Sequence, residues 1–265
     1  MRVIVLAKQV PELASAKLDR RTLALVRGSV LGAINPADRC ALEMALRLCE
    51  SCGGEVLAVC MGPEEAGNAL RWALAMGAQE AALIADAALV GSDAYITALC
   101  LARACQRLAP VDLILTGQTT TDGGCGQVGP RVAEELGLPH LSEVRKIEPH
   151  EGGLAVMCGH SGKLATFEVR PPALLAVAPG ACTPRYPSAP ALVRACQHEL
   201  LRFSLADLGL QPEEVGSAGS PTRVVRAQPV EGREGGVTLR GSAQQVAREL
   251  LSRVDEQLAC ETLAG

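Results

Sequence analysis

The residues best suited to chemistry lie in one glycine-rich stretch, TGQTTTDGGCGQVGP, which runs from Thr116 to Pro130. The apolar run VDLILTG leads into it, and a helical pattern opens near Gly126. The first N–H groups of such a helix, with its dipole, can hold a phosphate without any lysine. Hydroxyls, a carboxylate and an amide in the same stretch could bind the rest of a nucleotide. We therefore predict an anion site here, and not only a flexible connection.

Two common nucleotide motifs do not describe this stretch. The letters G-x-G-x-x-G occur from Gly124 to Gly129. That fingerprint belongs to the first β-α turn of its domain and needs an acid about 20 residues later, at the next strand end. Here it follows the fourth predicted strand, and Glu143 and Glu148 lie in a segment without clear periodicity. A Gly-Lys-Ser/Thr sequence is also missing, so the stretch is not a P-loop.

Other loops carry small or polar residues suited to close approach by a ligand. They are Leu6-Ala7-Lys8 and Met61-Gly62, each at a predicted strand end, and Asn35-Pro36-Ala37-Asp38 at a predicted helix start. In an open parallel sheet the ligand lies beyond the carboxyl ends of the strands, so we expect these loops to meet. We predict no catalytic nucleophile: the four histidines are scattered, and Ser161 lacks the G-x-S-x-G elbow.

The elements that must position these loops alternate between strand and helix. Nearly continuous apolar runs predict strands at 2–7, 55–61, 80–86 and 111–117. Helices are predicted from Asn35-Pro36, from Pro63, and from Ser92-Asp93 to about Leu108, by their caps and apolar spacing. The pattern predicts an α/β fold with a doubly wound, mainly parallel sheet.

The chain changes character toward its C-terminus. A hairpin is predicted over 155–170, turning at Ser161-Gly162, and one more buried strand over 173–179. From about Ser204 turn residues dominate, which predicts an extended arm, followed by an amphipathic helix over 242–260. We therefore predict a nucleotide-binding domain over 1–200 and an arm with a helix over 201–265. Because this tail has little core of its own, we expect it to pack on something else, either the same chain or a partner.

Composition limits the remaining choices. Hydrophobic residues make up 48% of the chain but aromatic residues only 2%, which excludes a wholly disordered chain and argues against nucleic-acid binding by stacking. Eleven irregularly spaced cysteines, with one C-x-x-C at Cys49 and Cys52, are read as apolar fillers in a reduced compartment and not as a metal site. The apolar run at the N-terminus is too short for a signal peptide and is interrupted by Lys8, and no run would span a membrane, so we expect a cytoplasmic protein without metal.

The same loops resemble those of the β subunit of electron-transfer flavoproteins. The match rests on AKQVPE, INPADRCALEMALRL, AVCMGP, ALAMGA, the glycine-rich stretch and TPRYPSAPALVRA, and it spans roughly the first 195 residues. The resemblance implies an adenine-nucleotide α-hydrolase-like (HUP-type) fold and a heterodimer with an FAD-bearing α subunit. Transfer of electrons between flavin dehydrogenases and an acceptor would be its function.

The resemblance also implies the site residues. The cofactor-binding residues would be Leu6, Ala7, Lys8, Asn35, Pro36, Asp38, Met61, Gly62, Gly117, Gln118, Thr119, Thr120, Thr121, Asp122, Gly123, Gly124, Cys125, Gly126, Gln127 and Val128.

Within the family this site takes two forms. One binds AMP as a structural ligand and usually carries three successive acids; the other binds a second FAD, receives hydride from NADH and divides electron pairs between acceptors (bifurcation). Asp122-Gly123, Gln127 to Pro130 and the GSPT at 219–222 resemble the FAD form. We expect FAD, with AMP as the alternative and a non-redox nucleotide-binding regulatory module as a lower one.

Some positions depart from the family pattern. Gly124 and Cys125 stand where the family has an acid and a threonine, which makes the loop more open. Near Val156 the family usually carries an arginine and, a few residues later, acids before a glycine. Cys158 to Ser161 stand here instead, so we do not expect the ion pair that those charged residues would form. A dehydrogenase or other oxidoreductase would dock on the Pro184–Ala195 region, where Ala189 replaces an anchoring leucine. That truncation would cost about 2 kcal/mol of buried contact.

Overall fold

The chain divides into two compact units, residues 1–225 and 226–265. The computed structural model describes residues 1–11, 17–18, 25–26, 32–225 and 236–262. The boundary between the units lies at 225/226, whereas the sequence placed a boundary at 200/201.

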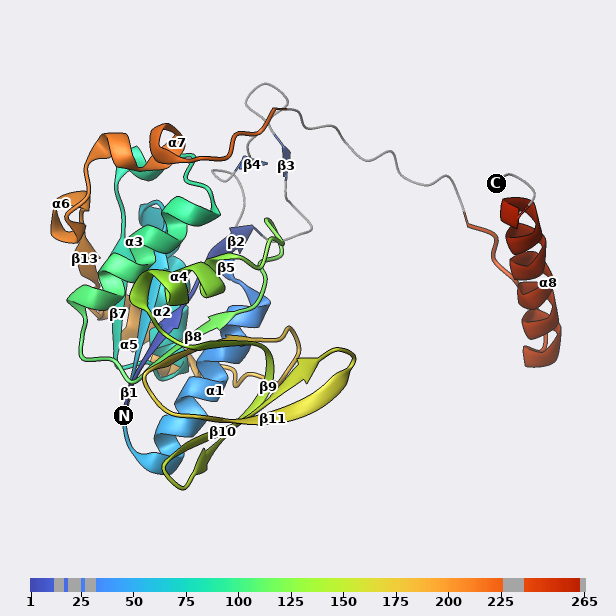
Figure 1. Cartoon of the computed structure of the whole chain (residues 1–265), viewed down its shortest axis with the longest axis horizontal. Coiled ribbons are helices and arrows are strands. Elements are labelled where there is room, and N and C mark those ends of the chain that lie inside the picture. The colour runs from blue at the N-terminus through green and yellow to red at the C-terminus, as the bar shows by residue number, and fades with distance from the viewer. Residues whose placement is uncertain (12–16, 19–24, 27–31, 226–235, 263–265) are drawn as a thin grey trace. The chain divides into compact units, whose positions relative to one another are not determined.

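The first unit is built on one large sheet (Figure 1). Within the described residues it has nine strands in the order β11-β10-β9-β12-β8-β1-β6-β7-β13. Neighbours from β9 to β13 are parallel, and β10 pairs antiparallel with β9 and β11. The strands are β1 (Arg2–Leu6), β6 (Glu55–Met61), β7 (Glu80–Ile84), β8 (Leu113–Gly117), β9 (His140–His150), β10 (Gly153–His160), β11 (Lys163–Val169), β12 (Ala173–Val177) and β13 (Leu201–Phe203).

Helices cover both faces of the central part of this sheet, which explains why β1, β8 and β12 are buried at nearly every position. In β1, Val3 and Val5 pack with α1 and α2, whereas Ile4 and Leu6 pack with α3 and α4. Such burial of alternate residues on opposite faces is the property of a doubly wound sheet. The helices are α1 (Pro36–Cys52), α2 (Gly67–Met76), α3 (Ala94–Arg107), α4 (Val128–Leu136) and α5 (Ala189–Gln197).

The predicted α/β class and the order of strands and helices are confirmed. The hairpin turning at Ser161-Gly162 and the buried strand after it are also present, as β10, β11 and β12. The fourth predicted helix begins at Val128, two residues later than expected. Short or irregular strands were missed: β9, β13 and the small pair β2 (Gln9–Pro11) and β5 (Gly32–Ile34).

The segment after Ser204 packs on the sheet unit and is not the extended arm that its turn residues predicted. It forms α6 (Leu205–Leu208), a 3-10 turn η4 (Pro212–Glu214) and α7 (Gly216–Gly219). Four apolar side chains from it are buried against the α3 side of the sheet, namely Leu205, Leu208, Leu210 and Val215. The prediction failed because these residues follow no single period.

The end of this segment is also fastened to the N-terminus of α3. Asp93 caps that helix by accepting from the N–H groups of Tyr95 and Ile96. Its other oxygen accepts from the Thr222 hydroxyl at 2.7 Å, and the Ser220 hydroxyl accepts from the Asp93 N–H at 2.9 Å. The serine and threonine of the GSPT motif therefore hold the end of this segment against the N-terminus of α3.

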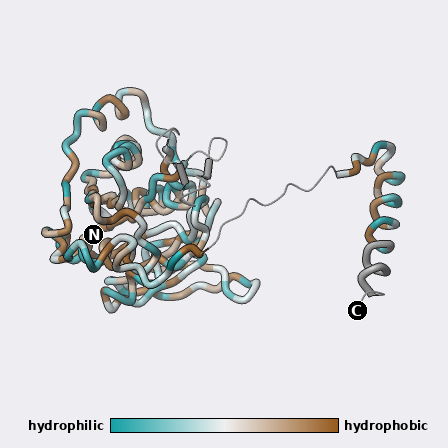
Figure 2. Tube along the Cα trace, turned by 90° about the horizontal axis from the view of Figure 1, so that it is seen from above, coloured by the Kyte–Doolittle hydropathy of each residue, from teal (hydrophilic) through white to brown (hydrophobic). Residues whose placement is uncertain are grey.

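The second unit contains α8 (Ala243–Thr262). Leu250, Leu251 and Val254 on this helix are exposed. Figure 2 shows hydrophobic and hydrophilic bands alternating along it. Among the described helices, none combines the length and the apolar character that crossing a bilayer requires.

Replacing Leu208 by alanine tests the packing of the 205–220 segment. Leu208 is 4% exposed, so Leu208→Ala should lower the free energy of unfolding by roughly 2 to 4 kcal/mol. Urea titration followed by the fluorescence of Trp72 measures this. Leu201 is 43% exposed and supplies the control, because Leu201→Ala should cost under about 1 kcal/mol. Equal costs for the two variants would show that the segment does not pack on the sheet.

Candidate functional site

Three of the predicted loop regions meet beyond the carboxyl ends of β1 and β8: the residues after β1, the start of α1 and the loop after β8. From β1 the chain continues through α1 to β6 and β7 on one side, whereas β8 and β12 lie on the other side. The point where strand order reverses in this way is where open α/β sheets bind ligands. The loop after β1 begins at Ala7, and the loop after β8 covers residues 118–127.

A buried carboxylate, Asp38 in the first turn of α1, joins the two strand ends. Its Oδ2 accepts from the Lys8 N–H at 2.7 Å, and its Oδ1 accepts from the Gly117 N–H at 3.1 Å and from Asn35 Nδ2 at 3.0 Å. Burial raises the pKa of Asp38 to about 7, and the three donors act in the opposite direction. Asp38 therefore fixes the spacing of the two strand ends at the site.

Asn35 attaches the glycine-rich loop to α1. The sequence predicted it as a helix cap, but its side chain makes no capping bond to α1. Its Nδ2 instead donates to the carbonyl of Thr119 at 2.9 Å, and its Oδ1 accepts from the Thr121 N–H at 3.3 Å. Because Asn35 is fully buried, these bonds replace the water that both groups would otherwise need.

The one acid of the loop, Asp122, is neutralised by a lysine from the β1 end. Lys8 Nζ lies 2.7 Å from Asp122 Oδ2 and 2.8 Å from Oδ1. Burial by itself raises the pKa of Asp122, but the bond and charge of Lys8, together with hydrogen bonds to Thr120 and Gly123, hold the pKa below its ordinary value. Asp122 thus serves to hold the loop against Lys8 and adds little negative charge to the site.

Glycines are required at two places in the loop for different reasons. A Cβ at Gly117 would stand 2.2 Å from Asp38 Oδ1 and 2.7 Å from the Cβ of Ala37, so a side chain has no room there. Gly124 and Gly126 have φ angles of +60° and +64°, which other residues adopt only with strain. The turn therefore brings Gly126 back beside Gln118, where the loop begins, before the chain enters α4.

The N-terminus of α4 follows this turn, at the position where the sequence predicts an anion site. The first bond within the helix runs from the Arg131 N–H to the carbonyl of Gln127 at 3.1 Å. The N–H groups of Gln127, Val128 and Gly129 precede that bond and have no acceptor inside the helix. Together with the helix dipole they can hold a phosphate oxygen.

The remaining predicted residues lie around this centre. Leu6 and Ala7 are buried at the end of β1, whereas Met61 and Gly62 end β6, on the side of β1 away from β8. Pro36 begins α1 and is exposed, and Thr120 lies in the loop, where its hydroxyl accepts from the Gly123 N–H. The side chains of Cys125 and Gln127 are exposed.

Glu143 belongs to the site region although the sequence analysis placed it in an irregular segment. It lies in β9, and its Oε1 accepts from Gln118 Nε2 at 2.6 Å. Its own N–H donates to Gln118 Oε1 at 2.7 Å. Only the positive φ of Glu143, invisible in a single sequence, marks it as unusual.

Groups that could support other chemistry are not assembled. All four histidines are exposed, and within the described residues no three His, Cys, Asp or Glu side chains form a group that could hold a metal. Cys49 and Cys52 are free thiols that contact backbone carbonyls, of Glu55 and Leu48 respectively.

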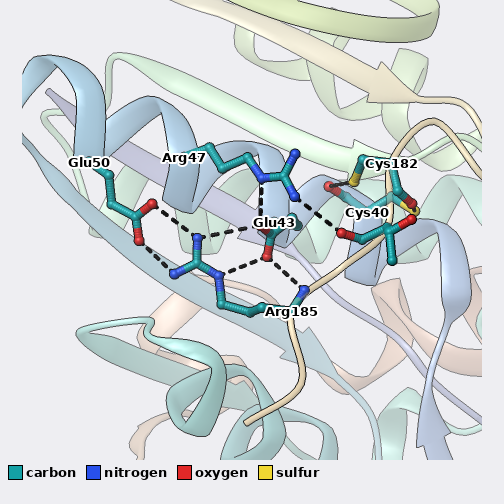
Figure 3. A network of polar contacts seen from close by, with 7 residues as sticks. Cys40, Glu43, Arg47, Glu50, Cys182 and Arg185 are labelled. Atoms are coloured by element: carbon teal, nitrogen blue, oxygen red, sulfur yellow. Dashed lines mark hydrogen bonds and ion pairs between the residues drawn. The ribbon is translucent and has the colours of Figure 1, made fainter.

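A second cluster, shown in Figure 3, holds the predicted docking segment Pro184–Ala195 against α1. Arg185 Nε lies 2.8 Å from Glu43 Oε2, and its other nitrogens bind Glu50. Arg47 Nε binds the second oxygen of Glu43 at 2.6 Å. Burial alone raises the pKa of Glu43, but the two arginines together hold it below its ordinary value.

Aromatic packing continues along the same segment. Tyr186 packs edge-on against Trp72 of α2, with 5.3 Å between ring centroids. The tyrosine is 75% exposed, and Ala189 at the start of α5 is exposed as well. The segment is thus fixed to α1 and α2 while it presents side chains to solvent.

Comparison with known proteins agrees with this geometry. Residues 22–208 match the family model described as "Electron transfer flavoprotein domain". The chain is 36% identical over 258 residues to an electron transfer flavoprotein subunit beta of Thermoanaerobacterium thermosaccharolyticum, covering 97% of this chain and 99% of that one. It is 35% identical over 259 residues to the caffeyl-CoA reductase-Etf complex subunit CarD of Acetobacterium woodii, with coverage of 97% and 99%. It is also 36% identical over 242 residues to Protein FixA of Rhizobium meliloti, with coverage of 88% and 83%.

Asp38 should give the free energy of unfolding a distinctive pH dependence. Its pKa is raised on folding, so the folded state binds the proton more tightly and this contribution is lost as pH rises toward about 7. Between pH 5 and pH 8 the loss should be roughly 2.5 kcal/mol, from about 1.4 kcal/mol per unit. Asp38→Asn removes the titration, and parallel urea-derived curves for the two proteins would contradict the assignment.

Proposed function

The chain belongs to the β subunit family of electron transfer flavoproteins, and from this premise we propose that it binds FAD in its own nucleotide site. In that role it passes electrons between a donor and the FAD of a partner α subunit. The alternative within the family is a simple carrier whose β site holds AMP as a structural ligand. The two forms differ in the ligand bound at the N-terminus of α4 and therefore in the negative charge of the phosphate groups placed there.

The observation that carries the proposal is the charge of the loop in front of α4. Asp122 is paired with Lys8 at 2.7 Å, and the next two residues are Gly123 and Gly124. A run of acids here would repel a diphosphate, which carries more charge than the single phosphate of AMP. A Cβ added at Gly124 would have one neighbour within 4 Å, the carbonyl oxygen of Thr120 at 3.9 Å, so there is open space beside Gly124. Room and low negative charge together favour the diphosphate of FAD.

The chain's own residues would bind and orient the cofactor. The N–H groups at the start of α4 would hold phosphate oxygens, and the loop hydroxyls of Thr119, Thr120 and Thr121 would contact the sugar or the phosphates. Asn35 and Asp38 would keep the loop in place from beneath. When bound, the flavin would supply the redox chemistry.

Donor and partner follow from the same premise. One relative is named as a subunit of a caffeyl-CoA reductase-Etf complex, which supports assembly of this chain into a complex with an oxidoreductase. We propose a heterodimer with an α subunit, NADH or a flavin dehydrogenase as donor, and electron bifurcation as the activity of the complex. The cysteines in the described part of the chain are free, which suits the reducing cytoplasm.

We place the docking of a dehydrogenase or other oxidoreductase on the Pro184–Ala195 segment. Arg185 and Tyr186 fix its first half to α1 and α2, so a partner would meet a preformed surface. Ala189 offers little area for burial, so Tyr186 is the larger exposed contact.

The decisive experiment counts nucleotides. The chain is produced with its α subunit, the heterodimer is denatured, and released FAD and AMP are quantified by chromatography. We expect about two FAD per heterodimer. One FAD and one AMP per heterodimer would contradict the FAD assignment and support the AMP-type carrier. If two FAD are found, bleaching of the complex by NADH tests whether hydride enters there.

Variants of Gly126 connect that count to the loop. Gly126→Asp places a carboxylate at the mouth of α4 and should reduce the β-site nucleotide by tenfold or more, since about 1.4 kcal/mol corresponds to tenfold. Gly126→Asn has the same shape without the charge and should lose less. Gly137→Asp is the matched control, because Gly137 ends the same helix with the same φ of +64° and open space around it. Full nucleotide content in Gly126→Asp would remove this glycine from the site.

The second unit is proposed to bind the α subunit through the exposed apolar residues of α8. A chain ending at Val225 keeps the whole first unit, including the buried 205–220 segment. It should unfold within a few degrees of the full-length chain but fail to co-purify with the α subunit. Undiminished co-purification would show that the first unit binds the α subunit without α8.

A further inference from the structure

Gln118 and Glu143 form a closed pair beside the nucleotide loop. Gln118 Nε2 donates to Glu143 Oε1 at 2.6 Å, and the Glu143 N–H donates back to Gln118 Oε1 at 2.7 Å. Both ends of the Gln118 amide are therefore used, which fixes its orientation. The second oxygen of Glu143 lies 3.6 Å from Arg145, so the carboxylate is held on both sides.

The backbone of β9 is distorted where this carboxylate is placed. Along β12, Leu175 and Val177 are two residues apart, but their partners Leu141 and Val144 in β9 are three apart, so β9 carries an extra residue. Glu143 lies in this bulge with φ of +56°, a conformation that costs free energy for any residue with a side chain. Bulges next to binding sites redirect side chains, and this one directs Glu143 to Gln118.

Gln118 in turn supports the part of the loop that faces the phosphate. It is the first residue after Gly117, and its N–H donates to the carbonyl of Val177 at 2.9 Å. Its own carbonyl lies 3.3 Å from where a Cβ of Gly126 would stand. The loop thus closes on the Gln118 peptide two residues before α4 begins. A shift of Gln118 would move Gly126 and, with it, the N–H groups at the helix start.

We propose that Glu143 is a positioning residue for the nucleotide site, acting through Gln118 on Gly126 and the first turn of α4. The inference rests on the proposed nucleotide site but holds for either FAD or AMP, because both place a phosphate at that turn. Without the carboxylate, Gln118 Nε2 would lose its acceptor, and only the bonds of the Gln118 N–H to Val177 and of its Oε1 to the N–H of residue 143 would remain.

Replacing Glu143 by glycine separates positioning from stability. Glu143→Gly removes the carboxylate and relieves the backbone, so the unfolding temperature should stay at or above that of the unaltered protein. The heterodimer should nevertheless lose its β-site nucleotide about tenfold faster on dialysis, measured by chromatography of released FAD and AMP. Glu143→Gln keeps an oxygen that accepts from Gln118 and should lose nucleotide no more than about twofold faster.

Ser161→Gly is the matched control for the backbone. Ser161 is the other non-glycine residue with positive φ (+49°) in the described chain, and it lies in the turn between β10 and β11. This variant should keep both stability and nucleotide. Equal retention in Glu143→Gly and Ser161→Gly overturns the positioning role, as does a nucleotide loss matched by a drop of several degrees in unfolding temperature.

The result is independent of the FAD count. Two FAD in the unaltered heterodimer with full retention in Glu143→Gly leaves the FAD assignment standing and overturns the positioning role. If the unaltered heterodimer contains AMP and Glu143→Gly loses that AMP rapidly, the FAD assignment is overturned and the positioning role stands.

Discussion

The burial of the Asp38 carboxylate is the constraint on which the site depends. Taking a charge out of water is costly unless donors replace the solvent, and Asp38 has three of them. Those donors come from the end of β1, the start of α1 and the end of β8. The three donors offset part of this cost, and burial outweighs them, which raises the pKa of Asp38 to about 7. Because the offset needs all three donors in place, the carboxylate fixes the spacing of these ends where the strand order reverses. The same closeness explains Gly117, where any side chain would collide with Asp38.

Three side chains from other parts of the first unit hold the loop beyond Gly117. Asn35 binds its backbone, Lys8 binds its one acid, and Glu143 binds Gln118 at its root. None of these contacts uses the N–H groups at the start of α4. These side chains fix the loop in advance, and such preorganisation lowers the entropy that a loop loses on binding a ligand.

The contacts to partners are organised differently from the nucleotide site. Glu43, buried in α1, fixes Arg185 and with it the segment before α5 (Figure 3). Buried ion pairs add little net stability, but removing one partner leaves an unpaired charge, so such a pair holds a segment in one place. The exposed apolar residues of α8, by contrast, lie in the second unit.

The sequence by itself determined the features that short-range rules govern. Apolar runs predicted β1, β6, β7 and β8, caps and spacing predicted α1 and α3, and the glycines near Gly126 predicted the mouth of α4. Tertiary structure decided the partners of polar side chains. Asn35 could cap its own helix or bind a loop 84 residues away, and only the packed distance selects the loop. Glu143 and the buried residues from Leu205 to Val215 follow no period, because a bulge and an irregular segment take their positions from the sheet they pack on.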